Sequence, residues 1–233
     1  MKPRLFTVGA PPQLALAHPD LFQVEPVGEL PLDFDVPALG YSGGQLLVLP
    51  GNGAEPWGLH ELRPDRVSLH SLLARACGIT RARKPEILDA MAGWGTDAAT
   101  LRALGCTVQS CEQEPMVWAL LLERDGSARC ADGFDVMRER SWPVIYLDPM
   151  FEPRGRKGLA KRPLQVLQQL AAPTERPLQD WLAVARQQAS DRVVLKCRAK
   201  AQPLATPDWQ IKGRSIRFDV YRPAAPPAET RSE

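Results

Sequence analysis

Short apolar runs alternate with amphipathic stretches along most of the chain. The runs with the length and composition of strands lie at residues 87–89, 107–111, 128–131, 143–147, 192–197 and 216–221. Helical spacing of apolar positions occurs at residues 65–77 and 96–104, and after Pro115 and Pro177. The first of these helices would be capped by Asp65 and stopped by Gly78. Alternating strands and helices predict an α/β fold with a doubly wound sheet.

The first 62 residues follow a different pattern. They are rich in proline and glycine, and their apolar pieces are short, at residues 5–8, 22–24 and 45–49. Two adjacent glycines between apolar flanks, in Tyr41-Ser42-Gly43-Gly44-Gln45, predict a hairpin turn. We therefore expect a small β-rich N-terminal lobe over residues 1–62, an α/β domain over 63–222 and a loose tail over 223–233.

Composition excludes several classes of protein. With 44% hydrophobic and 24% charged residues the chain is typical of a soluble globular protein, and a net charge of +2 is too small to indicate nucleic-acid binding by itself. The five cysteines are scattered without any C-x-x-C pair, so neither a disulfide framework nor a zinc site is expected. The N-terminus lacks the apolar core of a signal peptide, and no apolar run approaches the ~20 residues of a membrane helix. These features predict a cytoplasmic protein without a metal or a membrane segment.

A glycine turn follows the strand at residues 87–89. Asp89 ends the strand, and Gly93 and Gly95 precede a helix that begins at Thr96 and Asp97. Glycines allow a sharp turn and a close approach of a ligand, and the amides at the helix start attract an anionic group. A purely structural turn would use the same residues, so the glycine pair alone leaves both interpretations open.

An acid at the tip of the next strand favours a cofactor that contains a nucleoside. Glu112 lies roughly 20 residues beyond the glycines, the spacing at which an acid accepts hydrogen bonds from both ribose hydroxyls. Alternatively, Glu112 caps the helix that Pro115 opens. Further along, Asp132 and Gly133 could reach an adenine edge, which is a weak signal alone.

The charge of the glycine turn distinguishes between two candidate cofactors. A nicotinamide enzyme is expected to carry G-x-G-x-x-G, and Asp97 beside its pyrophosphate would be repulsive. S-adenosylmethionine has no phosphate and carries a sulfonium cation. Asp89 and Asp97 suit that charge, while the amides of the helix start can bind its carboxylate.

The run Asp148-Pro149-Met150-Phe151 follows the strand at residues 143–147. It resembles the N/D-P-P-Y/F motif of methyltransferases that modify exocyclic amino groups. In that role the Asp148 carboxylate and the Pro149 carbonyl accept hydrogen bonds from the two N–H groups of the amine, and Phe151 stacks on the base. In a doubly wound sheet, Asp148 would face the ligand held by the glycine turn. The alternative is an ordinary Asp-Pro turn.

Residues 87–221 resemble the ribosomal RNA small subunit methyltransferase J family. The glycine turn, Glu112 with Pro115, and the run from Asp148 to Phe151 carry the likeness. The resemblance implies a Rossmann-like class I methyltransferase sheet and transfer from S-adenosylmethionine to N2 of a guanine in 16S ribosomal RNA, as naked RNA or in the small ribosomal subunit. By the same match, the cofactor pocket would be lined by Thr96, Asp97, Glu112, Gln113, Asp132, Gly133 and Asp148.

The chain departs from this family before the first strand. The family has a run rich in arginine and glycine there, whereas this chain has residues 60–66 without any glycine, and the N-terminal lobe matches poorly. The departures leave the RNA site open. Two other functions remain: methylation of another amine in RNA, DNA or protein glutamine, and a non-catalytic RNA-binding module, which the presence of both Glu112 and Asp148 disfavours.

Basic residues follow two strands at the predicted ligand edge. Lys196, Arg198 and Lys200 lie at the tip of the strand at residues 192–197, and a basic loop follows Asp148, with Arg154, Arg156, Lys157, Lys161 and Arg162. We expect both groups to contact RNA phosphates, with Arg154, Arg156, Lys157, Lys161 and Lys196 as the main candidates. The alternative is a solvated loop.

Overall fold

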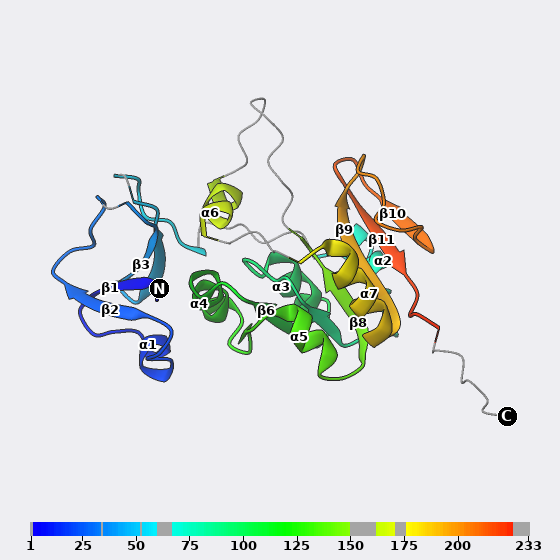
Figure 1. Ribbon diagram of the computed structural model, residues 1–233, viewed down its shortest axis with the longest axis horizontal. Helices are drawn as coiled ribbons and strands as arrows, with labels where there is room; N and C mark the ends of the chain where they lie inside the picture. The colour runs from blue at the N-terminus through cyan, green and yellow to red at the C-terminus, as the bar shows by residue number, and fades with distance from the viewer. Residues whose placement is uncertain are drawn as a thin grey trace.

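The computed structural model describes residues 2–33, 35–51, 53–59, 67–149, 162–170 and 176–225, which form two β-sheets with helices around them (Figure 1). The smaller sheet has four strands in the order β2-β1-β3-β4. The larger has seven, in the order β10-β11-β9-β8-β5-β6-β7. No helix among the described residues is long and apolar enough to cross a membrane.

The N-terminal lobe holds the smaller sheet, as expected. Its elements are β1 (Arg4–Val8), α1 (Gln13–Ala17), β2 (Gln23–Val27), β3 (Ala38–Ser42) and β4 (Gln45–Leu49). The predicted hairpin is confirmed: β3 and β4 pair antiparallel, and Gly43 and Gly44 form the turn with φ of 58° and 80°. Helix α1 was not predicted, and because it connects β1 to β2, these two strands pair in parallel.

The larger sheet confirms the doubly wound prediction. Its strands are β5 (Ile87–Asp89), β6 (Val108–Glu112), β7 (Arg129–Cys130), β8 (Trp142–Leu147), β9 (Ala189–Arg198), β10 (Trp209–Lys212) and β11 (Ile216–Tyr221). Strands β5 to β9 are parallel, while β11 and β10 are added antiparallel at one edge. Strand β8 returns to pair with β5, so the chain reverses its direction of growth between them. The carboxyl ends of β5 and β8 therefore flank the switch point.

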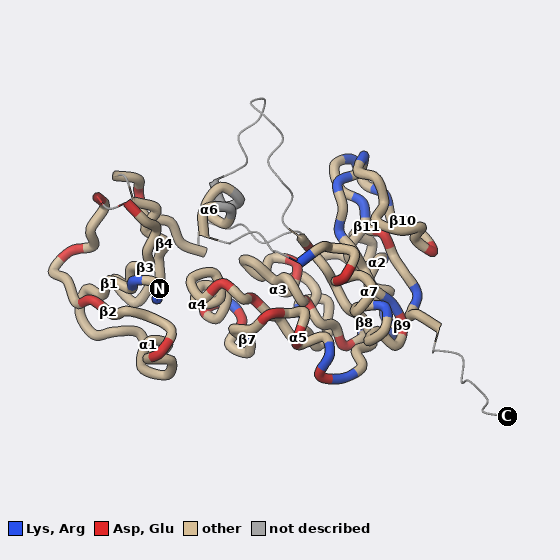
Figure 2. The backbone as a smooth tube through the Cα atoms, viewed as in Figure 1, with Lys and Arg blue, Asp and Glu red and all other residues tan. Residues whose placement is uncertain are grey.

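Helices cover both faces of this sheet. They are α2 (Leu72–Ala76), α3 (Thr96–Ala103), α4 (Pro115–Arg124), α5 (Gly133–Arg138), α6 (Arg162–Leu170) and α7 (Leu178–Gln188). Alternate strand residues face opposite sides: Leu88 and Ile145 pack with α5 and α7, whereas Ile87 and Val144 pack with α2 and α3. Basic residues gather along the backbone where β9, β10 and β11 turn (Figure 2).

The predicted helix at residues 65–77 was wrong in its start. Among the described residues, helix α2 begins at Leu72, because Ser71 adopts an extended conformation and its hydroxyl accepts a hydrogen bond from the amide of Ala74 at 3.1 Å. Upstream, Ser68 accepts from the amides of His70 and Ser71 in a turn that competes with helix. The stop at Gly78 is confirmed, with φ of 69°.

The N-terminal lobe packs against the part of the chain that holds the larger sheet, through α4. One apolar cluster contains residues of both parts, among them Leu39, Val48, Trp57, Trp94, Val117, Trp118 and Leu121. The rings of Trp57 and Trp94 lie 4.9 Å apart, and the amide of Leu46 donates to Oε1 of Glu123 at 3.1 Å. The N-terminal lobe and α4 therefore share a core, and Trp94 belongs to the glycine turn itself.

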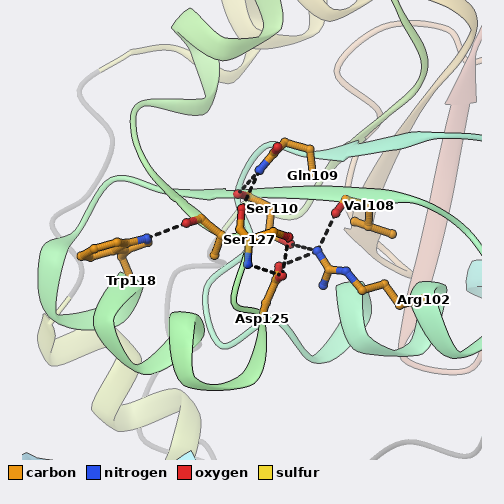
Figure 3. A network of polar contacts seen from close by, with 8 residues as sticks. Arg102, Val108, Gln109, Ser110, Trp118, Asp125 and Ser127 are labelled. Carbon is orange, nitrogen blue, oxygen red and sulfur yellow. Dashed lines mark hydrogen bonds and ion pairs between the residues drawn. The ribbon is translucent and has the colours of Figure 1, made fainter. Parts of the chain in front are cut away.

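A buried polar network fastens the segment that joins α4 to β7 (Figure 3). Nη2 of Arg102, on α3, donates to Oδ2 of Asp125 at 2.5 Å and to Oγ of Ser110 at 3.0 Å. The other carboxylate oxygen of Asp125 accepts from the amide and the hydroxyl of Ser127. Only 6% of Asp125 is exposed, so its charge depends on these partners.

Replacing Arg102 by methionine is expected to lower the free energy of unfolding by about 2–3 kcal/mol, because Asp125 stays buried without its cation. Urea unfolding followed by circular dichroism measures this loss. The matched control is Arg129→Met, which breaks an exposed pair with Glu139 and should cost under about 1 kcal/mol. Equal losses in the two variants would contradict the role assigned to the network.

Candidate active site

The glycine turn adopts the predicted strand, turn and helix arrangement. Gly93 and Gly95 have φ of 51° and 68°, values that side chains rarely tolerate. Gly95 is the residue that caps α3, and a Cβ atom there would lie 2.3 Å from Cδ1 of Leu121. Both the backbone conformation and the close packing therefore require glycine, and together they place the first amides of α3 beside the carboxyl end of β5.

A second glycine brings the turn after β7 against the turn after β5. A Cβ atom on Gly133 would lie 2.0 Å from the carbonyl oxygen of Ala90, so only glycine permits this contact. The preceding residue, Asp132, caps α5 by accepting from the amide of Phe134 at 2.9 Å, and its Oδ2 lies 3.7 Å from Nη2 of Arg176. Asp132 thus has a structural partner in addition to the adenine contact expected of it.

Glu112 connects the tips of β5 and β6. Its Oε2 accepts from the amide of Gly93 at 3.1 Å, and its Oε1 accepts from the amide of Glu114 at 2.9 Å. Burial raises the pKa of Glu112, and the bonds from backbone amides offset part of that shift. Each carboxylate oxygen has a further lone pair, so Glu112 can hold the turn and still accept from two hydroxyl groups.

Four polar side chains meet between α3 and the ends of β8 and β9. Nζ of Lys196 lies 2.8 Å from Oδ2 of Asp97 and 2.8 Å from Oδ2 of Asp148, and the hydroxyl of Tyr146 donates to Oδ2 of Asp97 at 2.5 Å. The register explains the meeting, because Leu147 pairs with Leu195 and the next residues are Asp148 and Lys196. We call these four residues, together with Asp89, which pairs with Tyr146 in the register of β5 and β8, the carboxylate–lysine cluster.

Asp89 is the deepest member of the cluster. It is 1% exposed, and neither of its carboxylate oxygens has a side-chain hydrogen-bond partner among the described residues. Burial and the nearby charges of Asp97 and Asp148 raise the pKa of Asp89 well above its usual range, and the Met91 amide offsets only part of this shift.

The other charged members shift in ways that follow from their neighbours. Burial and Asp97 raise the pKa of Asp148 to about 6, although Lys196 acts in the opposite direction. Burial lowers the pKa of Lys196, but the two carboxylates outweigh it and the net shift is upward. Two carboxylates thus share one ammonium, with a third carboxyl group, Asp89, buried beside them, and this excess of acidic over basic groups favours a bound cation.

The residues predicted for the site can be grouped by where the structure places them. Asp89, Asp97, Asp148 and Lys196 come together in the cluster, and Gly93, Gly95, Thr96, Glu112, Asp132 and Gly133 surround the adjoining turns. Gln113 is exposed beside Glu112, and Pro149 follows Asp148 at the end of β8. Phe151, Arg154, Arg156, Lys157 and Lys161 lie outside the described residues.

The structure gives Lys196 partners other than the RNA phosphate expected from the sequence. Its side chain is 20% exposed and paired with two carboxylates, so it is not free for a phosphate while these pairs persist. Sequence reasoning also missed Tyr146, whose hydroxyl bonds Asp97. A signal was present: Tyr146 is two residues before Asp148 on a strand, and therefore on the same face of the sheet.

The residues present fit S-adenosylmethionine. The amides at the start of α3 suit a carboxylate, the unpartnered Asp89 and the excess of acid in the cluster suit a sulfonium, and Glu112 retains acceptors for ribose hydroxyls. Gly133 lets the turn after β7 pack closely against the turn after β5, so that both turns can line one cofactor pocket. A pyrophosphate would meet Asp97 in the first turn of α3, which disfavours a dinucleotide.

Comparisons with known proteins agree with this geometry. The sequence model of a family described as SAM-dependent methyltransferases matches residues 65–140 and 132–223. The ribosomal RNA small subunit methyltransferase J of Thioalkalivibrio sulfidiphilus is 37% identical over 183 residues, 68% of this chain and 71% of the relative. The protein of the same name from Alkalilimnicola ehrlichii is 40% identical over 174 residues, 64% of this chain and 65% of the relative.

A solved structure extends the likeness to the N-terminal lobe. The crystal structure of a SAM-dependent methyltransferase from Neisseria gonorrhoeae matches with a TM-score of 0.66 and 23% identity, and covers 94% of this chain and 96% of that one. The sequence matches span about two thirds of the curated relatives. With the matching family model and the identity to these relatives, the chain belongs to the ribosomal RNA small subunit methyltransferase J family of S-adenosylmethionine-dependent methyltransferases.

Proposed function

We propose that this enzyme methylates the exocyclic N2 of a guanine in 16S ribosomal RNA, as free RNA or within the small ribosomal subunit. The names of the relatives support this substrate. The observation that carries the proposal is the position of Asp148 and Pro149 at the carboxyl end of β8, directly beside the strand that leads into the glycine turn.

The residues of the chain suggest how the amine is prepared. The lone pair of an aryl amine is delocalised into its base, so the nitrogen is a poor nucleophile. Asp148 and the carbonyl of Pro149 would accept hydrogen bonds from the two amine protons and favour a pyramidal nitrogen. Lys196 holds the Asp148 carboxylate in place, and Tyr146 with Asp97 holds Lys196 from the other side. S-adenosylmethionine supplies an electrophilic methyl group.

The other parts of the proposal follow from the same assignment. We assign cofactor binding to Asp89, Gly93, Gly95, Thr96, Asp97, Glu112, Gln113, Asp132, Gly133 and Asp148. We assign amine orientation to Asp148, Pro149 and Phe151, and phosphate contacts to the basic loop with Arg154, Arg156, Lys157 and Lys161. The enzyme would act in the cytoplasm, with residues 1–62 as a lobe attached to a catalytic domain at 63–222 and a tail at 223–233.

Nucleoside mass spectrometry tests the substrate. The 16S ribosomal RNA of cells lacking the protein should contain less N2-methylguanosine than that of wild-type cells, and the purified protein with labelled S-adenosylmethionine should restore the difference. The Asp148→Ala protein serves as the catalytic control. Label in N6-methyladenosine, in transfer RNA alone or in protein glutamine would replace the proposed substrate by another amine.

Glu112→Ala is expected to weaken S-adenosylmethionine binding by about 10- to 150-fold, because two ribose hydroxyls lose a charged acceptor worth roughly 1.5–3 kcal/mol. Isothermal titration calorimetry measures the dissociation constant. Glu112→Gln is the matched control, since it keeps the shape of the side chain and one acceptor and should lose less. An unchanged constant in Glu112→Ala would limit Glu112 to its bonds with Gly93 and Glu114.

A further inference from the structure

Three basic side chains are presented together at one end of the β9, β10 and β11 strands. Lys200 lies on the turn after β9, and Lys212 and Arg214 lie at the turn between β10 and β11; all three are exposed. Figure 2 shows this end of the strands in blue, at the upper right of the molecule. The nearest acid along β10, Asp208, lies beyond the opposite end of that strand. We call Lys200, Lys212 and Arg214 the basic hairpin tip.

The turn that carries Lys200 is held in place by hydrogen bonds from a buried side chain. Arg217 is 4% exposed, and its Nη1 donates to the carbonyls of Ala199 and Ala201 at 3.1 and 2.9 Å. Asp219 holds the guanidinium in turn, by accepting from its Nε and Nη2 at 2.7 and 2.8 Å. This buried pair fixes the backbone on both sides of Lys200, which lowers the conformational entropy that its turn would lose on binding.

The turn that carries Lys212 and Arg214 is also fixed. The amide of Gly213 donates to the carbonyl of Ile216 at 2.9 Å, and the amide of Ala199 donates to the carbonyl of Ser215 at 3.0 Å. A Cβ atom on Gly213 would lie 2.4 Å from Cδ1 of Leu72, so the turn packs closely on α2. The two turns are thus bonded to each other and present their cations as one surface.

The basic hairpin tip lies at the same end of the strands as the active site, where β8 and β9 have their carboxyl ends. Strands β8 and β9 are parallel and are followed by Asp148 and Lys200, whereas β11 is antiparallel to β9 and begins at the same end of the strands. Ile216 pairs with Arg198, which places the turn before β11 next to the end of β9. A polymer bound at Asp148 can therefore continue over the tip.

A surface groove extends from the tip along β10. It is lined by Pro203, Ala205, Thr206, Pro207, Trp209, Gln210 and Lys212. Lys212 belongs to both the groove and the tip, and the partly exposed Trp209 offers an indole ring in the groove wall. A cation beside a groove with an aromatic ring and an amide suits a single nucleic-acid strand, whose phosphates need cations and whose bases stack.

From these features we propose that the basic hairpin tip binds the phosphate backbone of a single-stranded segment of the substrate RNA, outside the target nucleotide. The inference rests on the proposed function, because it assumes an RNA substrate. The basic hairpin tip is distinct from the basic loop after Asp148. It lies on the turns of β9, β10 and β11, and hydrogen bonds fix its backbone.

The test compares two charge-matched double variants. Lys212→Ala/Arg214→Ala removes two cations from the tip, and Arg81→Ala/Lys84→Ala removes two exposed cations before β5, at the opposite edge of the sheet. Binding of a fluorescein-labelled single-stranded RNA is measured by anisotropy over a series of salt concentrations. The tip variant should bind about tenfold more weakly at low salt, with a salt slope shallower by about 1.4, while the control stays near wild type.

Methyl transfer to 16S ribosomal RNA transcribed in vitro separates this inference from the proposed function. The tip variant should show a raised KM for RNA, with kcat and the dissociation constant of S-adenosylmethionine unchanged. The proposal for the tip would be overturned if both double variants bound RNA with the same affinity and salt slope. It would also be overturned if the wild type bound anionic lipid vesicles more tightly than RNA. Absence of N2-methylguanosine with the wild-type protein would instead overturn the proposed function.

Discussion

Asp148→Ala should lower kcat by about 10²–10⁴-fold and change the dissociation constant of S-adenosylmethionine much less, because most of the cofactor contacts stay in place. Asp148 is the group placed to accept a hydrogen bond from the target amine, and its own side chain remains 27% exposed toward the site. Single-turnover methylation of 16S ribosomal RNA measures the rate, and calorimetry measures cofactor binding.

Asparagine at position 148 is the informative control. It keeps a carbonyl acceptor but loses the charge, so Asp148→Asn should retain more activity than Asp148→Ala and less than the wild type. Lys196 would keep Asp97 as a partner in both variants, which protects the fold. If Asp148→Ala transferred methyl groups at the wild-type rate, Asp148 would be a turn residue and the amine would be oriented by other groups.

Lys196→Met should move the pH dependence of kcat upward. The carboxylate form of Asp148 is the acceptor, so wild-type kcat should rise with pH through about 6, the value to which its pKa is raised. Lys196 lowers that pKa, and its loss should shift the rise to higher pH by about one unit or more. Lys84→Met removes an exposed lysine and should leave the profile in place.

The same variant should also lose stability in a pH-dependent way. Without Lys196, Asp89, Asp97 and Asp148 repel one another, and the loss should be about 3 kcal/mol at pH 8. The pKa values of Asp89 and Asp148, which burial already raises, would then be higher still in the folded protein, so the folded state binds more protons than the unfolded state and regains stability as the pH falls toward 5. A pH-independent loss together with an unmoved kcat profile would show that Lys196 contributes packing alone.

Local rules predicted the parts of the site that depend on nearby residues. The glycine turn follows from the conformations that only glycine adopts, and the hairpin at Gly43 and Gly44 follows for the same reason. The position of Asp148 beside β5 follows from the order in which doubly wound sheets are built.

Contacts between distant strands could not be predicted in the same way. Lys196 meets Asp148 across 48 positions of sequence because of the pairing register of β8 and β9. A shift of one residue would turn Lys196 to the other face, and nothing local to either strand fixes that register. Strand β10 was missed since it is an edge strand of only four residues, too short for its alternation of apolar and polar residues to be recognised, and helix α2 was overextended because Ser71 was not recognised as its cap.

The contact between Trp57 and Trp94 limits how the N-terminal lobe can vary. Trp94 lies between the two glycines of the cofactor turn, and Trp57 of the lobe packs on its ring. A substitution at the lobe surface of β2, whose residues are mostly exposed, changes nothing near the cofactor. A substitution at Trp57 alters the wall against which the turn is built. An exchanged or redesigned lobe could therefore acquire a new outer face, provided that it still offers a large ring to Trp94.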